Sequence, residues 1–165
     1  YRLSLLIGCG SFFGLRISDL LTLTWSMLLD NEKFVITEQK TGKRREIRVY
    51  CNFQKHIADC YKSLGVVDKN EKCFLSRKRT VYSTQRINVL FKSMKSKYNL
   101  KIEHFSTHSM RKTFGRQVVE AAGENSEFAL IKLSELFNHA DIQTTRRYLG
   151  LRSQELLETY DMLNF

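Results

Sequence analysis

The sequence predicts a mainly α-helical domain with one small antiparallel β-sheet, which is an α+β class. Apolar residues recur at helical spacing through most of the chain, and only residues 33–38 and 45–50 alternate and are rich in β-branched or aromatic side chains. The 165 residues are 42% hydrophobic and 27% charged, a globular composition long enough to bury a core. We therefore expect one domain over residues 1–165, without a stretch apolar enough to span a membrane.

The first third of the chain predicts two helices and a hairpin. Residues 2–12 read as an apolar helix that ends near Gly14, where glycine favours the left-handed cap conformation. Residues 18–25 read as a second helix with Ser18 as its N-cap. The two alternating segments flank the sequence QKTGKR, whose glycine indicates the turn of a β-hairpin.

The rest of the chain predicts helices only. Because the sequence contains no proline, glycine and Asn or Asp must end these elements. Ser83 is a candidate N-cap, and Gly123 a candidate C-cap. The expected helices cover residues 53–64, 84–98, 107–122, 126–137, 142–149 and 153–163.

The expected helix over 107–122 has two distinct faces. Met110, Phe114 and Val118 are four residues apart and form an apolar stripe. His108 and Arg111, three residues apart, share another face together with a glycine at position 115. A glycine inside a helix costs about 1 kcal/mol, so it needs a reason. Two interpretations are open: the glycine lets the backbone of a bound partner approach closely, or it relieves packing between helices.

The charge pattern favours a nucleic-acid partner. The 27 Lys and Arg against 17 Asp and Glu give a net charge of +10. Residues 72–102 hold nine basic and no acidic residues, whereas residues 120–165 hold eight acidic and four basic ones. The alternative is a solvated basic face without a ligand.

Cysteine and histidine do not predict a metal centre. The cysteines show no Cys-x-x-Cys spacing, and the histidines do not pair with them at zinc-finger spacing. We expect reduced thiols, no metal ion and no cofactor. The residues concerned are Cys9, Cys51, Cys60, Cys73, His56, His104, His108 and His139.

Five short motifs occur in order, and each alone has an ordinary structural explanation. They are GLRISDL at 14–20, QKTGK at 39–43, HSMR at 108–111, LFNHADI at 136–142 and TTRRYLG at 144–150. Together, from about residue 5 to residue 150, they resemble the tyrosine recombinase (phage integrase) family. The resemblance implies that family's catalytic-domain fold, with Tyr148 as nucleophile and Asp19 as an orienting acid. The assisting groups that it implies are Arg16, Lys40, His108, Arg111 and His139.

The sequence departs from the family pattern at a few positions. Asn138 stands where the family usually has glycine, and asparagine is the next-best residue for a left-handed turn. Lys112 replaces a common histidine, and Leu149 and Gly150 follow the tyrosine where Thr-His is frequent. Lys43 is an alternative to Lys40, which we prefer because Thr-Gly follows it as in the family.

The resemblance implies site-specific recombination of double-stranded DNA through a 3′-phosphotyrosyl intermediate, without metal or ATP. The expected protein is an integrase of a mobile element such as a phage or conjugative transposon. It would act in the prokaryotic cytoplasm, without a membrane partner. Two alternatives are a relaxing enzyme similar to type IB topoisomerases and a DNA-binding module without catalysis.

Two further expectations concern surfaces and chain ends. The chain opens without Met and without a signal peptide, so we expect an N-terminally truncated fragment whose tail, residues 151–165, is a helix. That tail packs on its own domain or helps to build a homo-tetramer on DNA. Basic residues are expected to contact phosphates. The candidates are Lys43, Arg44, Arg45, Arg77, Lys78, Arg79, Arg86 and Lys112.

Overall fold

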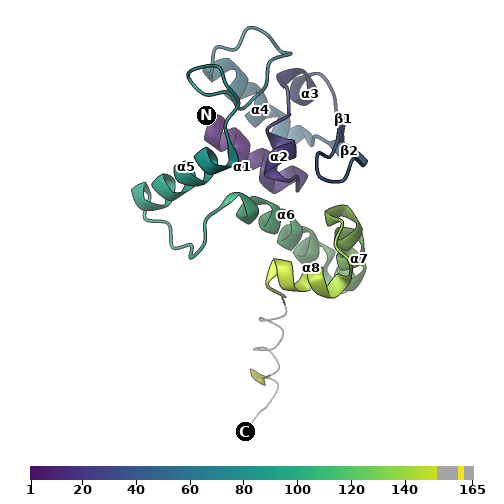
Figure 1. Ribbon diagram of the computed structural model, residues 1–165. Coiled ribbons are helices and arrows are strands. Elements are labelled where there is room, and N and C mark those ends of the chain that lie inside the picture. The colour runs from purple at the N-terminus through teal and green to yellow at the C-terminus, as the bar shows by residue number, and fades with distance from the viewer. Residues whose placement is uncertain (152–159, 162–165) are drawn as a thin grey trace. The chain divides into compact units, whose positions relative to one another are not determined.

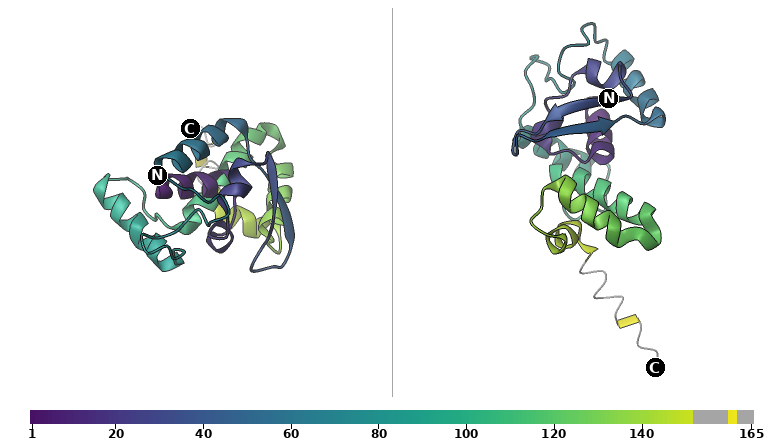
Figure 2. Two further views of the ribbon diagram at one scale, coloured as in Figure 1. Left: turned by 90° about the horizontal axis from the view of Figure 1, so that it is seen from above. Right: turned by 90° about the vertical axis from the view of Figure 1, so that its right-hand side faces the viewer.

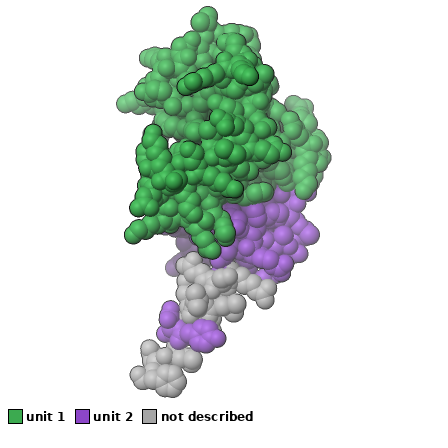
Figure 3. All heavy atoms as spheres, turned by 60° about the vertical axis from the view of Figure 1, so that its left-hand side comes forward, with its two compact units in different colours: residues 1–111 green, residues 112–165 purple. Residues whose placement is uncertain are grey.

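The computed structural model describes residues 1–151 and 160–161, in the order shown in Figure 1. Unit 1 is Tyr1–Arg111 and unit 2 is Lys112–Phe165, coloured separately in Figure 3. Among these residues no helix has the length and apolar character needed to cross a membrane. The elements are α1 (Arg2–Phe13), α2 (Ile17–Leu20), α3 (Trp25–Leu29), β1 (Lys33–Thr37), β2 (Arg44–Arg48), α4 (Cys51–Ser63), α5 (Thr84–Lys97), α6 (Thr107–Ala122), the 3₁₀ turn η1 (Gly123–Asn125), α7 (Ser126–Phe137) and α8 (Ile142–Leu149).

Unit 1 is built around α1. Leu5 and Leu6 of this helix are buried, and α4 packs along it. Trp25 of α3 joins the same apolar cluster and makes an edge contact with the ring of Tyr61 at 5.3 Å between centroids. Burying a side chain of this size contributes about 2 kcal/mol, so the cluster holds the helices of unit 1 together.

The strands β1 and β2 form an antiparallel hairpin at the edge of unit 1 (Figure 2). Phe34 pairs with Ile47 and Ile36 with Arg45, so alternate residues of both strands face the core. Gly42 has φ +67° in the turn, where a residue with a Cβ would be strained. The predicted hairpin is confirmed, with strand bounds that differ by one or two residues.

The predicted helix over 18–25 is wrong. The structure has two short helices instead, α2 and α3, and Ser18 caps neither of them. Long-range backbone hydrogen bonds interrupt the helix: Cys73 N–H donates to the carbonyl of Leu23, and a β-bridge joins Thr24 to Lys72. The Thr24 side chain then accepts from the Met27 N–H and starts α3.

The other predicted helices within the described residues are confirmed, with bounds within about two residues of those expected. Gly14 ends α1 at φ +59°, Ser83 accepts from the Arg86 N–H at the start of α5, and Gly123 follows α6 at φ +51°. The predicted helix over 153–163 falls almost entirely on residues that lie outside the described ones.

The apolar stripe of α6 is divided between two cores. Met110 belongs to the cluster of unit 1, and its side chain lies so close to Gly10 that a Cβ there would come within 2.6 Å of its sulfur. Phe114 and Val118 pack instead on the cluster of unit 2, around Phe137. One helix therefore supplies side chains to both units.

Candidate active site

Arg16 lies where α1 gives way to α2. The left-handed Gly14 ends α1, and Arg16 itself is the N-cap residue of α2, in an extended conformation. Its Nη1 donates to Oε2 of Glu38 at 2.8 Å, and about one fifth of its side chain is exposed. A charge-assisted hydrogen bond of this kind orients the guanidinium.

The side chain of Arg111 reaches the same connection between α1 and α2. It is 5% exposed, and its Nη1 donates to the carbonyl oxygen of Gly14 at 3.0 Å. That carbonyl lies two residues before Arg16, so Arg111 is hydrogen-bonded to the backbone connection that carries Arg16, although the two residues are 95 positions apart in the sequence.

Asp19 ties α2 to the hairpin turn. Its carboxylate is buried, and Oδ1 accepts from the backbone N–H of Gln39 at 2.9 Å. Lys40 is the next residue and is exposed. Two backbone hydrogen bonds close the turn. The Gly42 N–H donates to the Glu38 carbonyl, and the Glu38 N–H donates to the Lys43 carbonyl. Asp19 thus holds the turn that presents Lys40 and Lys43.

Glu38 is a member of the site that the sequence interpretation missed. It is 4% exposed, and besides Arg16 it accepts from Thr41 Oγ1 at 2.8 Å and lies 3.7 Å from Nη1 of Arg45. Burial alone would raise the pKa of Glu38, but the hydrogen bonds from Thr41 and Arg16, with the charges of Arg16 and Arg45, lower it. The signal was available, since strand alternation places Glu38 on the same face as Phe34 and Ile36.

His108 lies in the first turn of α6, one turn before Arg111, and its side chain is exposed. The preceding residue, Thr107, is buried, and its N–H donates to Oδ1 of Asn88 in α5 at 3.1 Å. Unit 1 therefore contains four of the predicted catalytic residues, which are Arg16, Lys40, His108 and Arg111.

Unit 2 contains the other two, His139 and Tyr148, whose rings meet edge to face at 5.2 Å between centroids. Phe137 packs on both rings, at 5.5 and 5.7 Å. Nδ1 of His139 lies 2.9 Å from Oγ1 of Thr145, a fully buried hydroxyl one turn before Tyr148. These contacts fix the imidazole beside the phenol.

Two caps set the path of the chain between His139 and Tyr148. Asn138 ends α7 in the left-handed conformation at φ +54°, as predicted for this position. Asp141 then caps α8 by accepting from the Thr144 N–H at 2.6 Å, and this hydrogen bond lowers the pKa of its carboxyl group.

Gly115 has a packing role in unit 2. A Cβ at this position would lie 2.5 Å from Cδ2 of Leu149 and 3.2 Å from the ring of Phe137. Of the two open readings, relief of helix packing is therefore the one that the contacts support, and α8 lies against α6 because residue 115 has no side chain.

The predicted phosphate-binding residues have different surroundings. Lys43 and Arg44 are exposed, whereas Arg45 donates from Nη2 to the Phe13 carbonyl at 2.7 Å and faces inward. Burial lowers the pKa of Arg45, and the charge of Glu38 opposes that effect. Nζ of Lys112 lies 5.4 Å from the ring centroid of Tyr148, in cation–π contact.

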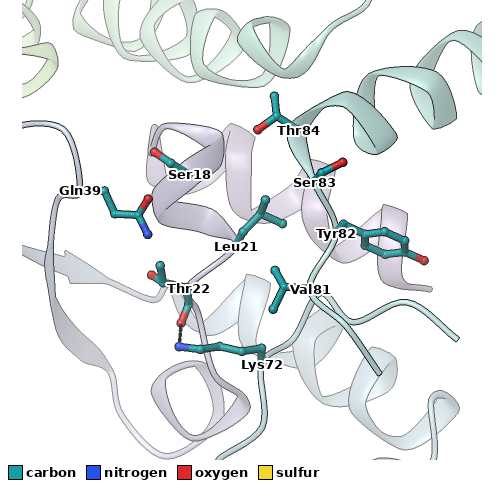
Figure 4. A pocket seen from close by; sticks show the side chains of 9 residues that line it. All are labelled: Ser18, Leu21, Thr22, Gln39, Lys72, Val81, Tyr82, Ser83 and Thr84. Atoms are coloured by element: carbon teal, nitrogen blue, oxygen red, sulfur yellow. Dashed lines mark hydrogen bonds between the residues drawn. The ribbon is translucent and has the colours of Figure 1, made fainter. Parts of the chain in front are cut away.

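Two adjoining hollows mark the surface of unit 1 beside the Lys40 turn. The first, of about 410 Å³, takes in Gln39 of the turn, Ser18 of α2 and Thr84 of α5 (Figure 4). Lys72 also lines this hollow and donates to the Thr22 carbonyl at 2.5 Å. The second, of about 730 Å³, shares Val81, Tyr82 and Ser83 with the first and adds Ser76, Arg77, Lys78, Thr80, Arg86 and Leu90.

Hydroxyl groups and cations thus line a groove that we call the basic groove, defined by Arg77, Lys78 and Arg86. Arg79 is exposed and forms an ion pair with Glu71. Within residues 1–151 and 160–161, no three His, Cys, Asp or Glu side chains are grouped so as to hold a metal ion.

Comparison with known proteins identifies the family. The model of the phage integrase family matches residues 3–155. The chain belongs to the phage integrase family. Similar proteins include the probable integrase/recombinase YoeC of Bacillus subtilis strain 168, 29% identical over 83% of this chain and 71% of that protein. Tyrosine recombinase XerC of Xanthomonas campestris pv. campestris strain B100 is 26% identical over 90% of this chain and 44% of its own length.

Solved structures of the phage integrase family confirm the predicted fold. XerA recombinase superposes with a TM-score of 0.68 at 19% identity, over 99% of this chain and 64% of that one. The catalytic core of lambda integrase gives 0.60 at 22% identity, over 78% and 79%. The chain spans less than half the length of the XerC relative.

Proposed function

We propose that this chain is the catalytic domain of a tyrosine recombinase that cleaves and rejoins double-stranded DNA. The observation that supports this most is the hydrogen bond from Arg111 to the Gly14 carbonyl, at the connection of unit 1 that carries Arg16, in a family member that also has His139 against Tyr148 in unit 2. Related structures include the Tn1549 transposon integrase in complex with circular intermediate DNA, which makes duplex DNA the substrate to test.

In the proposed reaction, the phenol oxygen of Tyr148 attacks a backbone phosphorus and the bond from phosphorus to the 5′-oxygen breaks. The product is a 3′-phosphotyrosyl bond and a free 5′-hydroxyl. Negative charge grows on the non-bridging oxygens, and Arg16 and Arg111 neutralise it because a guanidinium stays charged and donates in a fork. His139 adds a hydrogen bond, and each such donor is worth about 3 kcal/mol.

Two proton transfers accompany this attack. The Tyr148 hydroxyl must lose its proton before or during the attack, and His108 accepts or relays that proton. The ammonium of Lys112, 5.4 Å from the phenol ring, favours the phenolate electrostatically. Lys40 gives its proton to the departing 5′-oxygen.

The phosphotyrosyl bond conserves the energy of the broken phosphodiester. A 5′-hydroxyl of another strand then attacks the phosphorus, reseals the DNA and returns the phenol, so the cycle consumes no ATP. This distinguishes recombination from hydrolysis, in which water would take the place of the second strand.

The decisive experiment offers the protein a nicked suicide duplex, from which the cleaved 5′-end is lost. We expect a covalent protein–DNA adduct on a denaturing gel, and transfer of the bound strand to a second labelled duplex. Relaxation of supercoiled DNA without transfer would indicate a topoisomerase-like enzyme instead. Binding without an adduct would leave only a DNA-binding module.

Lys40 as general acid makes a prediction about the leaving group. Lys40→Met should slow cleavage of ordinary DNA by about 100-fold, because the 5′-oxygen then departs as an unprotonated alkoxide. A substrate with sulfur at the 5′-bridging position should be spared, since a thiolate leaves without a proton. Lys43→Met is the matched control in the same turn. Single-turnover rates on both substrates test this, and equal slowing on both would reject the role of Lys40.

The basic groove is proposed to hold DNA phosphates. A triple variant should weaken duplex binding; it combines Arg77→Gln, Lys78→Gln and Arg86→Gln. The negative slope of log K against log salt should become shallower by about 3, because each neutralised phosphate releases counterions. Titrations between low and moderate salt measure this slope. Arg79→Gln is the control, since Arg79 already pairs with Glu71. An unchanged slope in the triple variant would place the DNA elsewhere.

We also propose that the protein serves a mobile element, in the prokaryotic cytoplasm, as a homo-tetramer assembled on two duplexes. The tail over 151–165, almost all of it outside the described residues, is the candidate link between copies. Sedimentation with and without paired target DNA tests this: a species that stays monomeric on DNA would contradict it.

A further inference from the structure

We infer that Glu38 is a positioning residue that fixes Arg16 and the Lys40 turn at once. This inference rests on the proposed function, since it assumes that Arg16 and Lys40 act on the same phosphate. One carboxylate would then set the positions of two groups with different tasks: Arg16, which stabilises charge, and Lys40, which donates a proton.

The burial of Glu38 is the first argument. Its neighbours on the inward face of β1, Phe34 and Ile36, are core residues, so a carboxylate in register with them is removed from water. A buried charge is costly unless ion pairs and hydrogen bonds compensate it. A carboxylate at 4% exposure therefore has to be held by its partners, and it constrains those partners in turn.

The partners come from different elements. A single oxygen, Oε2, accepts from Arg16 at the start of α2 and from Thr41 in the turn, both at 2.8 Å. The backbone of Glu38 closes the same turn, because its carbonyl accepts from the Gly42 N–H and its N–H donates to the Lys43 carbonyl. Moving this side chain would therefore disturb the guanidinium and the turn together.

A second contact completes the fixation of the turn. Gln39, before Lys40, is held by the Asp19 carboxylate, and Thr41, after it, is held by Glu38. The backbone of Lys40 is thus anchored on both sides while its side chain is exposed. Such anchoring places the base of a long side chain at a fixed distance from the reacting phosphate.

Thr41 allows the two effects to be separated. Thr41→Val removes the hydroxyl that binds Glu38 and leaves the pair of Glu38 and Arg16 in place, whereas Thr41→Ser keeps the hydroxyl. Thr41→Val should slow cleavage of ordinary DNA about tenfold and leave the 5′-bridging sulfur substrate within about twofold, because only proton donation is misplaced. Thr41→Ser should match the parent protein on both.

Glu38→Gln tests the other arm. It keeps an acceptor for Thr41 but loses the charge that orients Arg16, so cleavage of both substrates should slow by about tenfold or more. If Thr41→Val slowed both substrates equally, or if Glu38→Gln slowed neither, the inference would be overturned.

Amide hydrogen exchange decides the point without any DNA chemistry. In Thr41→Val, the Gly42 amide of the turn should exchange about tenfold faster than in the parent protein, whereas Thr41→Ser and Glu38→Gln, which keep a hydrogen bond between residues 38 and 41, should exchange near the parent rate. Unchanged exchange in Thr41→Val would sink the inference even if the enzyme is active. A parent protein that forms no adduct while the exchange pattern holds would refute the proposed function and leave the positioning role intact.

Discussion

Tyr148→Phe should abolish the covalent adduct with suicide DNA and leave duplex binding within about twofold. The substitution removes one oxygen, the proposed attacking atom, and phenylalanine at this position cannot form a phosphotyrosyl bond. The ring contacts to His139 and Phe137, at 5.2 and 5.7 Å between centroids, involve the aromatic face and edge that phenylalanine keeps. The adduct is measured on a denaturing gel and binding on a native one.

Tyr160→Phe is the matched control for this experiment. Tyr160 is also a tyrosine of the C-terminal part of the chain, and it is 73% exposed. Its substitution should leave the adduct at the parent level. An adduct that persists in Tyr148→Phe and disappears in Tyr160→Phe would move the nucleophile to the tail.

Arg111→Lys should reduce the rate of cleavage by about 100- to 1000-fold, the effect of losing one preorganised donor. Lysine keeps the positive charge but cannot donate in a fork, so it cannot contact the Gly14 carbonyl and a phosphate with the guanidinium's geometry. Single-turnover cleavage at saturating protein measures the chemical step apart from DNA binding.

Arg48→Lys provides the comparison, because Arg48 lies exposed on β2 and the chemical change is the same. It should stay within about twofold of the parent rate. Loss of the hydrogen bond to Gly14 should also cost Arg111→Lys about 1 kcal/mol of stability, so thermal unfolding is measured in parallel. A normal cleavage rate in a folded Arg111→Lys would remove this residue from the catalytic set.

Local sequence signals were sufficient for most of the fold because they act within one element. Ser83 and Gly14 mark helix ends through caps that involve only neighbouring residues. The segment 18–25 was misread because its conformation depends on hydrogen bonds from residues near Cys73, about 50 positions away. No periodicity within the segment reports such a pairing.

The candidate site, like the fold, could be predicted only in part. The motifs bring the expected residue types in order, and the structure brings Arg16 and Arg111 to one connection. The sequence interpretation assigned the basic residues of the hairpin to contacts with DNA phosphates. It overlooked Glu38, the buried carboxylate that accepts from Arg16 and lies beside Arg45. Applying strand alternation beyond the last apolar residue would have placed Glu38 and Arg45 inward, facing each other.

The left-handed residue that ends α1 has a consequence for how mutants of this protein are interpreted. Gly14 at φ +59° offers its carbonyl to Arg111, and any side chain at this position would strain that backbone conformation. A Gly14→Val protein would then resemble an active-site mutant in a genetic screen, although residue 14 supplies no side chain to the chemistry. Its lowered melting temperature would show that the defect begins in the backbone, and restoring glycine at this position would restore both stability and activity.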